Sequence, residues 1–95
     1  MPILRTSIFD VWLDSLSDLK GQTVIAARLV RAGAGNLGNV KPLGGGVSEM
    51  KIKYGPGYRL YYTVRQQNII FLNGGDKSSQ KRDIEAAKGY SAMIP

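Results

Sequence analysis

Four cations recur at odd-numbered positions along one stretch of the chain, and a single carboxylate precedes them. The cations are Lys51, Lys53, Arg59 and Arg65, and the carboxylate is Glu49. In extended strands alternate side chains share a face, so this spacing predicts one basic face on two neighbouring strands. Such a face can bind phosphate, and it can stabilise the charge that develops when a ribose 2′-OH attacks the adjacent phosphate. The pattern therefore points to RNA binding and metal-independent RNA cleavage.

The proton acceptor for such a reaction is less well defined by the sequence. Glu49 is the only acidic group on the predicted face, and a lysine that loses its proton because other cations crowd it is the alternative. Tyr61 lies among the cations, where it could stack on a base or assist proton transfer. Lys77 belongs to the turn 75–80, which precedes a helix whose first N–H groups favour phosphate.

Each of these features also has a purely structural interpretation. A basic sheet face can simply be solvated, with its long side chains apart. In the turn before the last helix, Asp76 or Ser78 is expected to cap the first N–H groups, and this role leaves Lys77 free to join a site.

Composition narrows the possible functions further. Thirteen Lys and Arg stand against seven Asp and Glu, which gives a net charge of +6. A small basic domain usually meets nucleic acid or an acidic protein. The chain has no histidine, no cysteine and only two glutamates, so neither a metal or other cofactor nor a Ser-His-Asp arrangement is expected. Without an apolar run of about 18 residues or a signal peptide, we expect a cytoplasmic protein with no membrane partner.

The hydrophobic pattern predicts one α+β domain over residues 1–95, because helical and alternating periods occupy separate parts of the chain. The expected order is β-α-α-β-β-β-α, with the helices packed on one face of a small antiparallel sheet. The Gly-rich segment 33–46 lacks the pattern of a phosphate loop and is interpreted as a loop. The predicted elements are a strand at 3–5, helices from Ser7 and over 22–32, strands at 49–54, 58–65 and 69–73, and a helix over 78–90.

The segment KIKYGPGYRLYY, residues 51–62, is predicted to form a hairpin with a three-residue Gly-Pro-Gly loop. This register places Tyr54 opposite Tyr58 and Lys53 opposite Arg59. Facing like charges cost up to about 1 kcal/mol. An anion bound between the two cations would offset that cost.

Two longer runs, GNLGNVKPLGGGVSEMKIKYGPGYRLYY and GGDKSSQKRDIEAAK, resemble the phage-type addiction module killer proteins, a HigB-like branch of the RelE/ParE toxin superfamily. The helical start FDVWLDSLSDLKGQTVIAARLVRAGAGN fits the same family, so the resemblance extends from about Leu4 to Tyr90. It implies a RelE-like fold, with two N-terminal helices against an antiparallel sheet and a C-terminal helix.

The resemblance also implies a function and a set of site residues. RelE-like toxins of type II toxin-antitoxin systems inhibit translation by cutting mRNA on the ribosome. Lys51, Lys53 and Arg59 match the catalytic lysines and arginine of such enzymes, and Lys77 and Gln80 belong to this branch's DKSSQ motif. Arg65, Gln80 and Lys41 are assigned to RNA binding, while Lys51, Lys53, Arg59, Lys77, Glu49 and Tyr61 form the predicted catalytic set.

The partners implied by the resemblance are a cognate antitoxin of the helix-turn-helix type, mRNA on the ribosome, and operator DNA only through the antitoxin complex.

Three positions depart from the family pattern. The chain lacks the C-terminal histidine of many relatives, Tyr90 is the one possible match to a terminal tyrosine, and Asn39 stands where Asp is common. The same superfamily contains gyrase poisons that cut no RNA, and a non-catalytic module that only binds antitoxin is a third alternative.

Overall fold

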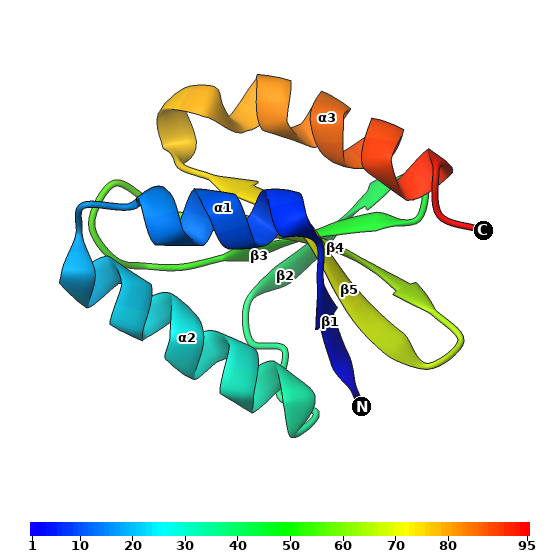
Figure 1. Cartoon of the computed structure of the whole chain (residues 1–95), viewed down its shortest axis with the longest axis horizontal. Helices are drawn as coiled ribbons and strands as arrows, with labels where there is room; N and C mark the ends of the chain where they lie inside the picture. The colour runs from blue at the N-terminus through cyan, green and yellow to red at the C-terminus, as the bar shows by residue number, and fades with distance from the viewer.

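The chain folds into five strands, three α-helices and one 3-10 helix, and the computed structural model describes all residues from Met1 to Pro95. Figure 1 follows these elements from the N-terminus to the C-terminus. In chain order they are β1 (Ile3–Arg5), α1 (Ser7–Ser15), α2 (Leu19–Gly33), β2 (Val40–Gly44), β3 (Val47–Lys51), β4 (Arg59–Arg65), β5 (Asn68–Gly75), η1 (Lys77–Ser79) and α3 (Gln80–Ala92). The predicted α+β class with three helices is confirmed.

The sequence-based order omitted strand β2, which lies inside the glycine-rich segment predicted to be a loop. Pairing of Val40 with Met50 and of Lys41 with Glu49 attaches β2 to the edge of the sheet. Gly45 and Gly46 both have positive φ, at 62° and 76°, so the chain reverses there at little steric cost. Most β2 side chains are exposed, and an exposed edge strand leaves little hydrophobic alternation to detect.

The five strands form one mixed sheet in the order β1-β5-β4-β3-β2. Strand β1 runs parallel to β5, and every other neighbouring pair is antiparallel. The antiparallel prediction is thus correct for the pairing of β3, β4 and β5 and wrong for β1, and it did not include β2. Gln66 and Gln67, both with positive φ, form the two-residue turn between β4 and β5.

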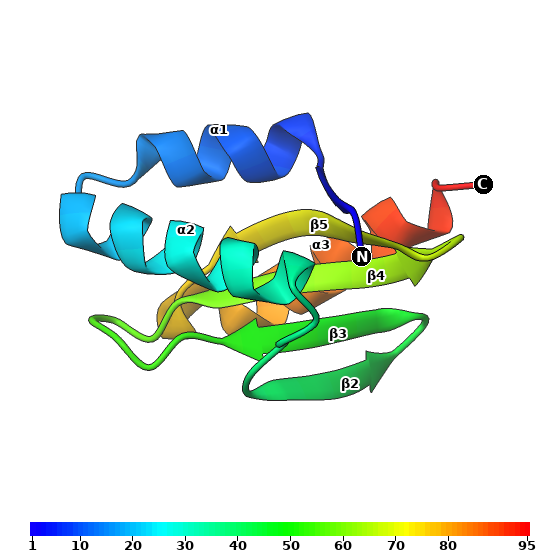
Figure 2. The ribbon, with the colours of Figure 1, turned by 90° about the horizontal axis from the view of Figure 1, so that it is seen from below.

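Helices cover both faces of the sheet, so the prediction that they all pack on one face is wrong. Side chains of α1 and α2 join one cluster with Met50, Leu60 and Phe71. Ala87 of α3 joins a second cluster with Val47, Tyr61 and Leu72. In Figure 2, α2 passes in front of the strands and α3 lies behind them. The strand face expected to be open and basic is therefore largely covered by α3.

Local capping explains where the helices begin. The Thr6 hydroxyl oxygen accepts from the Phe9 N–H at 3.0 Å and caps α1, which begins at Ser7 as predicted. The same hydroxyl donates to the Leu72 carbonyl at 2.6 Å, which ties α1 to β5. Asp18 caps α2 by accepting from the Gly21 N–H at 2.9 Å, and the helix begins at Leu19, three residues before the predicted start. None of the helices combines the length and apolar character needed to cross a membrane.

The loop between β3 and β4 is longer than the predicted Gly-Pro-Gly turn, and its position is fixed by α2. The loop spans residues 52–58, and Tyr58 donates its hydroxyl proton to Asp18 Oδ2 at 2.8 Å. Burial and the Asp18 hydrogen bond raise the pKa of Tyr58 to about 12. The Gly21 N–H and the Tyr58 hydroxyl lower the pKa of Asp18 below its ordinary value. The hydrogen bond thus couples the hairpin loop to the start of α2.

We predict that Tyr58→Phe lowers the free energy of unfolding by about 1 to 2 kcal/mol near neutral pH, because the ring stays buried while the hydrogen bond is lost. Asp18 has a lowered folded-state pKa, so its stabilising contribution is present above its ordinary pKa and is lost as the pH falls through the folded value. Tyr58 has a raised pKa, so its contribution is present below about pH 10 and is lost as the pH rises toward 12. Urea unfolding of both proteins across pH should show the difference greatest between about pH 5 and 9. A constant difference at all pH values would contradict this coupling.

Candidate functional site

A polar pocket of about 350 Å³ opens where β2, β3 and β4 meet the first turn of α3. Only one of its seven lining residues is hydrophobic, and three are cations. The lining residues are Asn39, Val40, Lys41, Glu49, Lys51, Arg59 and Gln80. The pocket thus combines four segments of the chain, of which the first is at residues 39–41 and the last at Gln80.

Strand pairing explains how these side chains come together. Lys41 pairs with Glu49 across β2 and β3, and Lys51 pairs with Arg59 across β3 and β4. Alternation within β3 puts Glu49 and Lys51 on one face, and this face carries α3. The predicted pairing of Lys53 with Arg59 is wrong, because the longer loop shifts the register by two residues. Lys51 is the lysine beside Arg59.

Arg59 is the buried cation of the pocket, with only 6% of its surface exposed. Its Nη1 group donates to the Gly57 carbonyl in the β3–β4 loop, which fixes the side chain. Its Nε lies 3.9 Å from Glu49 Oε1 and has no hydrogen-bond partner. Buried N–H groups usually find acceptors, so an unpaired buried donor on a pocket-lining arginine is a group that a bound acceptor could complete.

Glu49 is equally buried, at 6% exposure, and faces three cations. The Gln80 side-chain amide donates to Glu49 Oε1 at 2.8 Å. Gln80 is the first residue of α3, and the turn before it is fixed by Asp76, whose carboxylate accepts from the Ser78 N–H at 2.8 Å. Of the two predicted capping residues, Asp76 caps η1, whereas α3 itself begins after Ser79 without a side-chain cap. The pocket therefore holds one oriented carboxylate within an excess of positive charge.

Lys53 and Lys77 are both exposed, and neither is among the residues that line the pocket. Lys53 belongs to the β3–β4 loop. Lys77 adjoins the same loop, since a Cβ placed on Gly57 would lie 3.8 Å from Lys77 Cβ and 2.9 Å from Arg59 Nη1. The structure therefore places Lys77 beside the part of the loop that holds Arg59, whereas Lys53 is not among the lining residues.

Tyr61 is fully buried, so the expectation that it stacks on a base is wrong for this structure. It pairs with Glu49 on one side and with Asn73 on the other, beneath α3. Burial raises its pKa well above the ordinary value, and the charges of Glu49 and Asp83 raise it further. Its hydroxyl has no hydrogen-bond partner. A tyrosine in this setting stays protonated at neutral pH and cannot accept a proton there.

Arg65 lies at the opposite end of β4 from the pocket, about 20 Å along the strand. Its guanidinium donates to the Thr63 hydroxyl and to Ser91 Oγ, the latter at 3.1 Å. These bonds connect β4 to the last turn of α3. Arg65 thus has a structural role here. Tyr90 packs against the second hydrophobic cluster and does not line the pocket.

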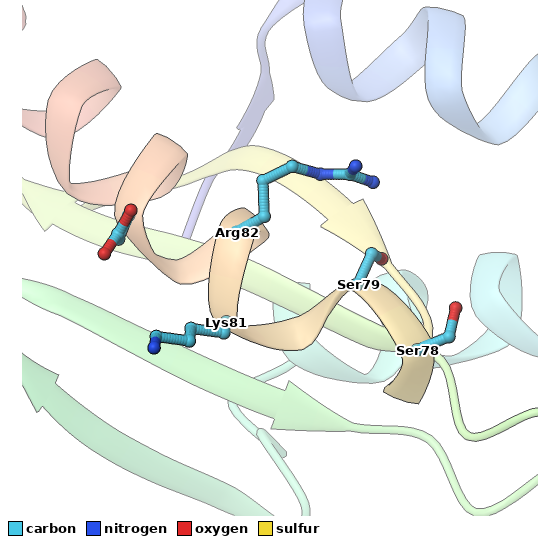
Figure 3. Close-up of a pocket in the computed structure, with 5 residues that line it drawn as sticks. Ser78, Ser79, Lys81 and Arg82 are labelled. Atoms are coloured by element: carbon cyan, nitrogen blue, oxygen red, sulfur yellow. The ribbon is translucent and has the colours of Figure 1, made fainter.

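A second pocket, of about 310 Å³, lies over the start of α3 (Figure 3). It is lined by Ser78, Ser79, Lys81, Arg82 and Glu85. Figure 3 shows the Lys81 and Arg82 side chains extending in different directions from the helix. This pocket has no buried charged group comparable to Arg59, so the first pocket is the stronger candidate site.

Sequence reasoning missed the contact between Gln80 and Glu49 and the contribution of Asn39 and Val40. The exposed residues of β2 give little alternation to detect, and their glycine-rich surroundings favoured the interpretation as a loop. Contact between α3 and β3 leaves no local pattern, because it depends on which sheet face the helix covers.

The structure defines the protein as an α+β fold, with a five-stranded mixed sheet between helices and a basic pocket at the sheet edge. No family model matches the chain. It is 43% identical over 89 residues to an uncharacterized protein from Haemophilus influenzae, and the match covers 90% of this chain and 88% of that protein. The chain therefore belongs to the same family as this Haemophilus influenzae protein.

Proposed function

We propose that the chain is the toxin of a type II toxin-antitoxin system, and that it inhibits translation by cutting mRNA on the ribosome. The observation that carries this proposal is the pocket in which Lys41, Lys51 and the buried Arg59 surround a single buried carboxylate, Glu49. The α+β fold and the resemblance to HigB-like members of the RelE/ParE superfamily support it.

In the proposed reaction, Lys51 and Arg59 bind the scissile phosphate. Glu49 accepts the proton of the ribose 2′-OH as its oxygen attacks phosphorus. The bond from phosphorus to the 5′-oxygen breaks, the departing oxygen takes up a proton from water, and a 2′,3′-cyclic phosphate remains. The two cations stabilise the negative charge on the phosphoryl oxygens more strongly in the transition state than in the ground state. Lys41 and Lys77 flank the site and bind neighbouring phosphates.

The proposed partners follow from the same assignment. A cognate antitoxin of the helix-turn-helix type would neutralise the toxin and would connect it to operator DNA. The net charge of +6 favours an acidic antitoxin surface, because complementary charge accelerates and orients association. We place this activity in the cytoplasm, where translating ribosomes are found.

The proposal predicts that induction of the protein in cells produces new 5′ ends within translated mRNA, detected by primer extension, while plasmid supercoiling stays unchanged. The same transcript without its start codon is the control, since ribosome-dependent cleavage requires translation. Loss of supercoiling without mRNA cleavage would indicate a gyrase poison instead. Growth arrest with neither effect would also exclude the proposed reaction.

A further inference from the structure

Arg59 and Glu49 are oppositely charged neighbours that do not form a direct hydrogen bond. Both are 6% exposed, yet Arg59 Nε lies 3.9 Å from Glu49 Oε1 and has no partner. A guanidinium and a carboxylate that lie side by side frequently form two parallel hydrogen bonds of about 2.8 Å. The open arrangement raises the question of which contacts hold the two groups in place.

The group in position to do so is Gln80. Its Nε2 donates to the same oxygen, Glu49 Oε1, at 2.8 Å. Gln80 begins α3, and the backbone around it is fixed by the Asp76 cap and by the bond from the Ser79 hydroxyl to Asp83. The amide thus holds the carboxylate from the helix side of the pocket, while Arg59 is held from the loop side by the Gly57 carbonyl.

We propose that Gln80 is a positioning residue that keeps the Glu49 carboxylate from pairing with Arg59, so that the Arg59 Nε–H and its charge stay available to an anion in the pocket. The identity of that anion as an RNA phosphodiester rests on the proposed function. Separation of the two charged groups is a property of the protein alone.

Loss of the amide has a defined consequence. Without Gln80, the carboxylate can rotate toward Arg59 and form the paired arrangement, because no other side chain donates to Glu49. The Glu49 carboxylate then compensates the charge of the Arg59 guanidinium and accepts a hydrogen bond from its Nε–H. An incoming anion would have to displace Glu49, so its affinity should fall.

The test uses the variant Gln80→Leu and inorganic sulfate as the probe. Nitrogen-15 NMR of the arginine Nε–H groups should show a downfield proton shift for Arg59, caused by its new bond to Glu49. The sulfate affinity should fall about tenfold, within the range of couplings measured between contacting residues. Lys81→Met, which removes an exposed cation from the same helix turn, is the control and should leave the Arg59 signal unchanged. If Gln80→Leu does not fold, the unbranched Gln80→Met serves for the same measurements.

A double-variant cycle with Glu49→Gln separates positioning from direct contact. In the Glu49→Gln background no carboxylate can neutralise Arg59, so adding Gln80→Leu should leave the sulfate affinity nearly unchanged. An equal loss in both backgrounds would show that Gln80 touches the anion or merely supports the fold, and would overturn the inference. An unchanged Arg59 Nε–H signal in Gln80→Leu would overturn it as well.

The same variants distinguish this inference from the proposed function. If the sulfate cycle gives the expected pattern but the wild-type protein cleaves no RNA, the positioning role stands and the ribonuclease assignment fails. If the wild-type protein cleaves RNA and Gln80→Leu cleaves it equally fast, with an unchanged Arg59 signal, the positioning role fails and the ribonuclease assignment stands.

Discussion

Replacing Lys51 by methionine should reduce the rate of mRNA cleavage by about a hundredfold or more, the typical effect of removing one preorganised donor to a transition-state oxyanion. Lys51 is exposed and lies opposite Arg59, so its ammonium can reach a phosphate that Arg59 also binds. Methionine keeps an unbranched stem of similar length and removes only the charge. The free energy of unfolding should change by less than about 0.5 kcal/mol, as for most surface substitutions.

The matched control is Lys53→Met, which makes the same change two residues further along. Lys53 is also exposed but does not line the pocket, so its loss should lower the cleavage rate by no more than about threefold, as expected for a peripheral charge. Single-turnover cleavage of programmed ribosomes measures both variants. Equal losses in the two variants would mean that overall charge matters rather than the pocket. A larger loss in Lys53→Met would place the site in the hairpin loop.

The second large effect concerns stability. Gly74→Ala should lower the free energy of unfolding by about 3 kcal/mol, at the upper end of the usual cost of overpacking. A Cβ at Gly74 would lie within 2.7 Å of three atoms of the Trp12 ring. Trp12 cannot easily move aside, because it packs against Phe9 at a centroid distance of 5.7 Å and against Tyr58 at 6.2 Å. The added methyl would therefore push α1 away from β5.

Gly89→Ala provides the matched control for this substitution. Gly89 lies in α3, and nothing lies within 4 Å of a Cβ placed there. Alanine at this exposed helical position should raise the free energy of unfolding by about 1 kcal/mol, since glycine is a poor helix former. Thermal and urea unfolding of both variants measure the contrast. A neutral Gly74→Ala would show that α1 does not pack as closely on β5 as the structure indicates.

The sequence predicted helices and central strands well, because their apolar residues repeat at helical or alternating spacing. Edge strand β2 escaped prediction because its stability comes from pairing with β3 rather than from a buried face. The alternation in β4 was detected, but its odd-numbered residues were assigned to solvent. Tyr61 and Thr63 are 0% and 1% exposed, because α3 crosses that face. Periodicity identifies two faces of a strand and does not say how many are covered.

The candidate site was predicted in part. Glu49, Lys51, Arg59, Lys41 and Gln80 meet in one pocket, whereas Lys53, Lys77, Tyr61 and Arg65 lie elsewhere. The error in hairpin register came from assuming the shortest loop that the Gly-Pro-Gly sequence allows. The hydrogen bond from Tyr58 to Asp18 and the backbone turn at 54–57 instead favour a seven-residue connection.

By itself, the sequence determined the α+β class, the excess of positive charge and the residue types available for chemistry. These depend on composition and local spacing, which a linear chain carries directly. Only the tertiary structure decided that α3 covers the basic face, that Lys51 rather than Lys53 faces Arg59, and that Gln80 holds Glu49. Those outcomes depend on the length of a loop and the side on which a helix packs, and both are set by contacts between residues far apart in the chain.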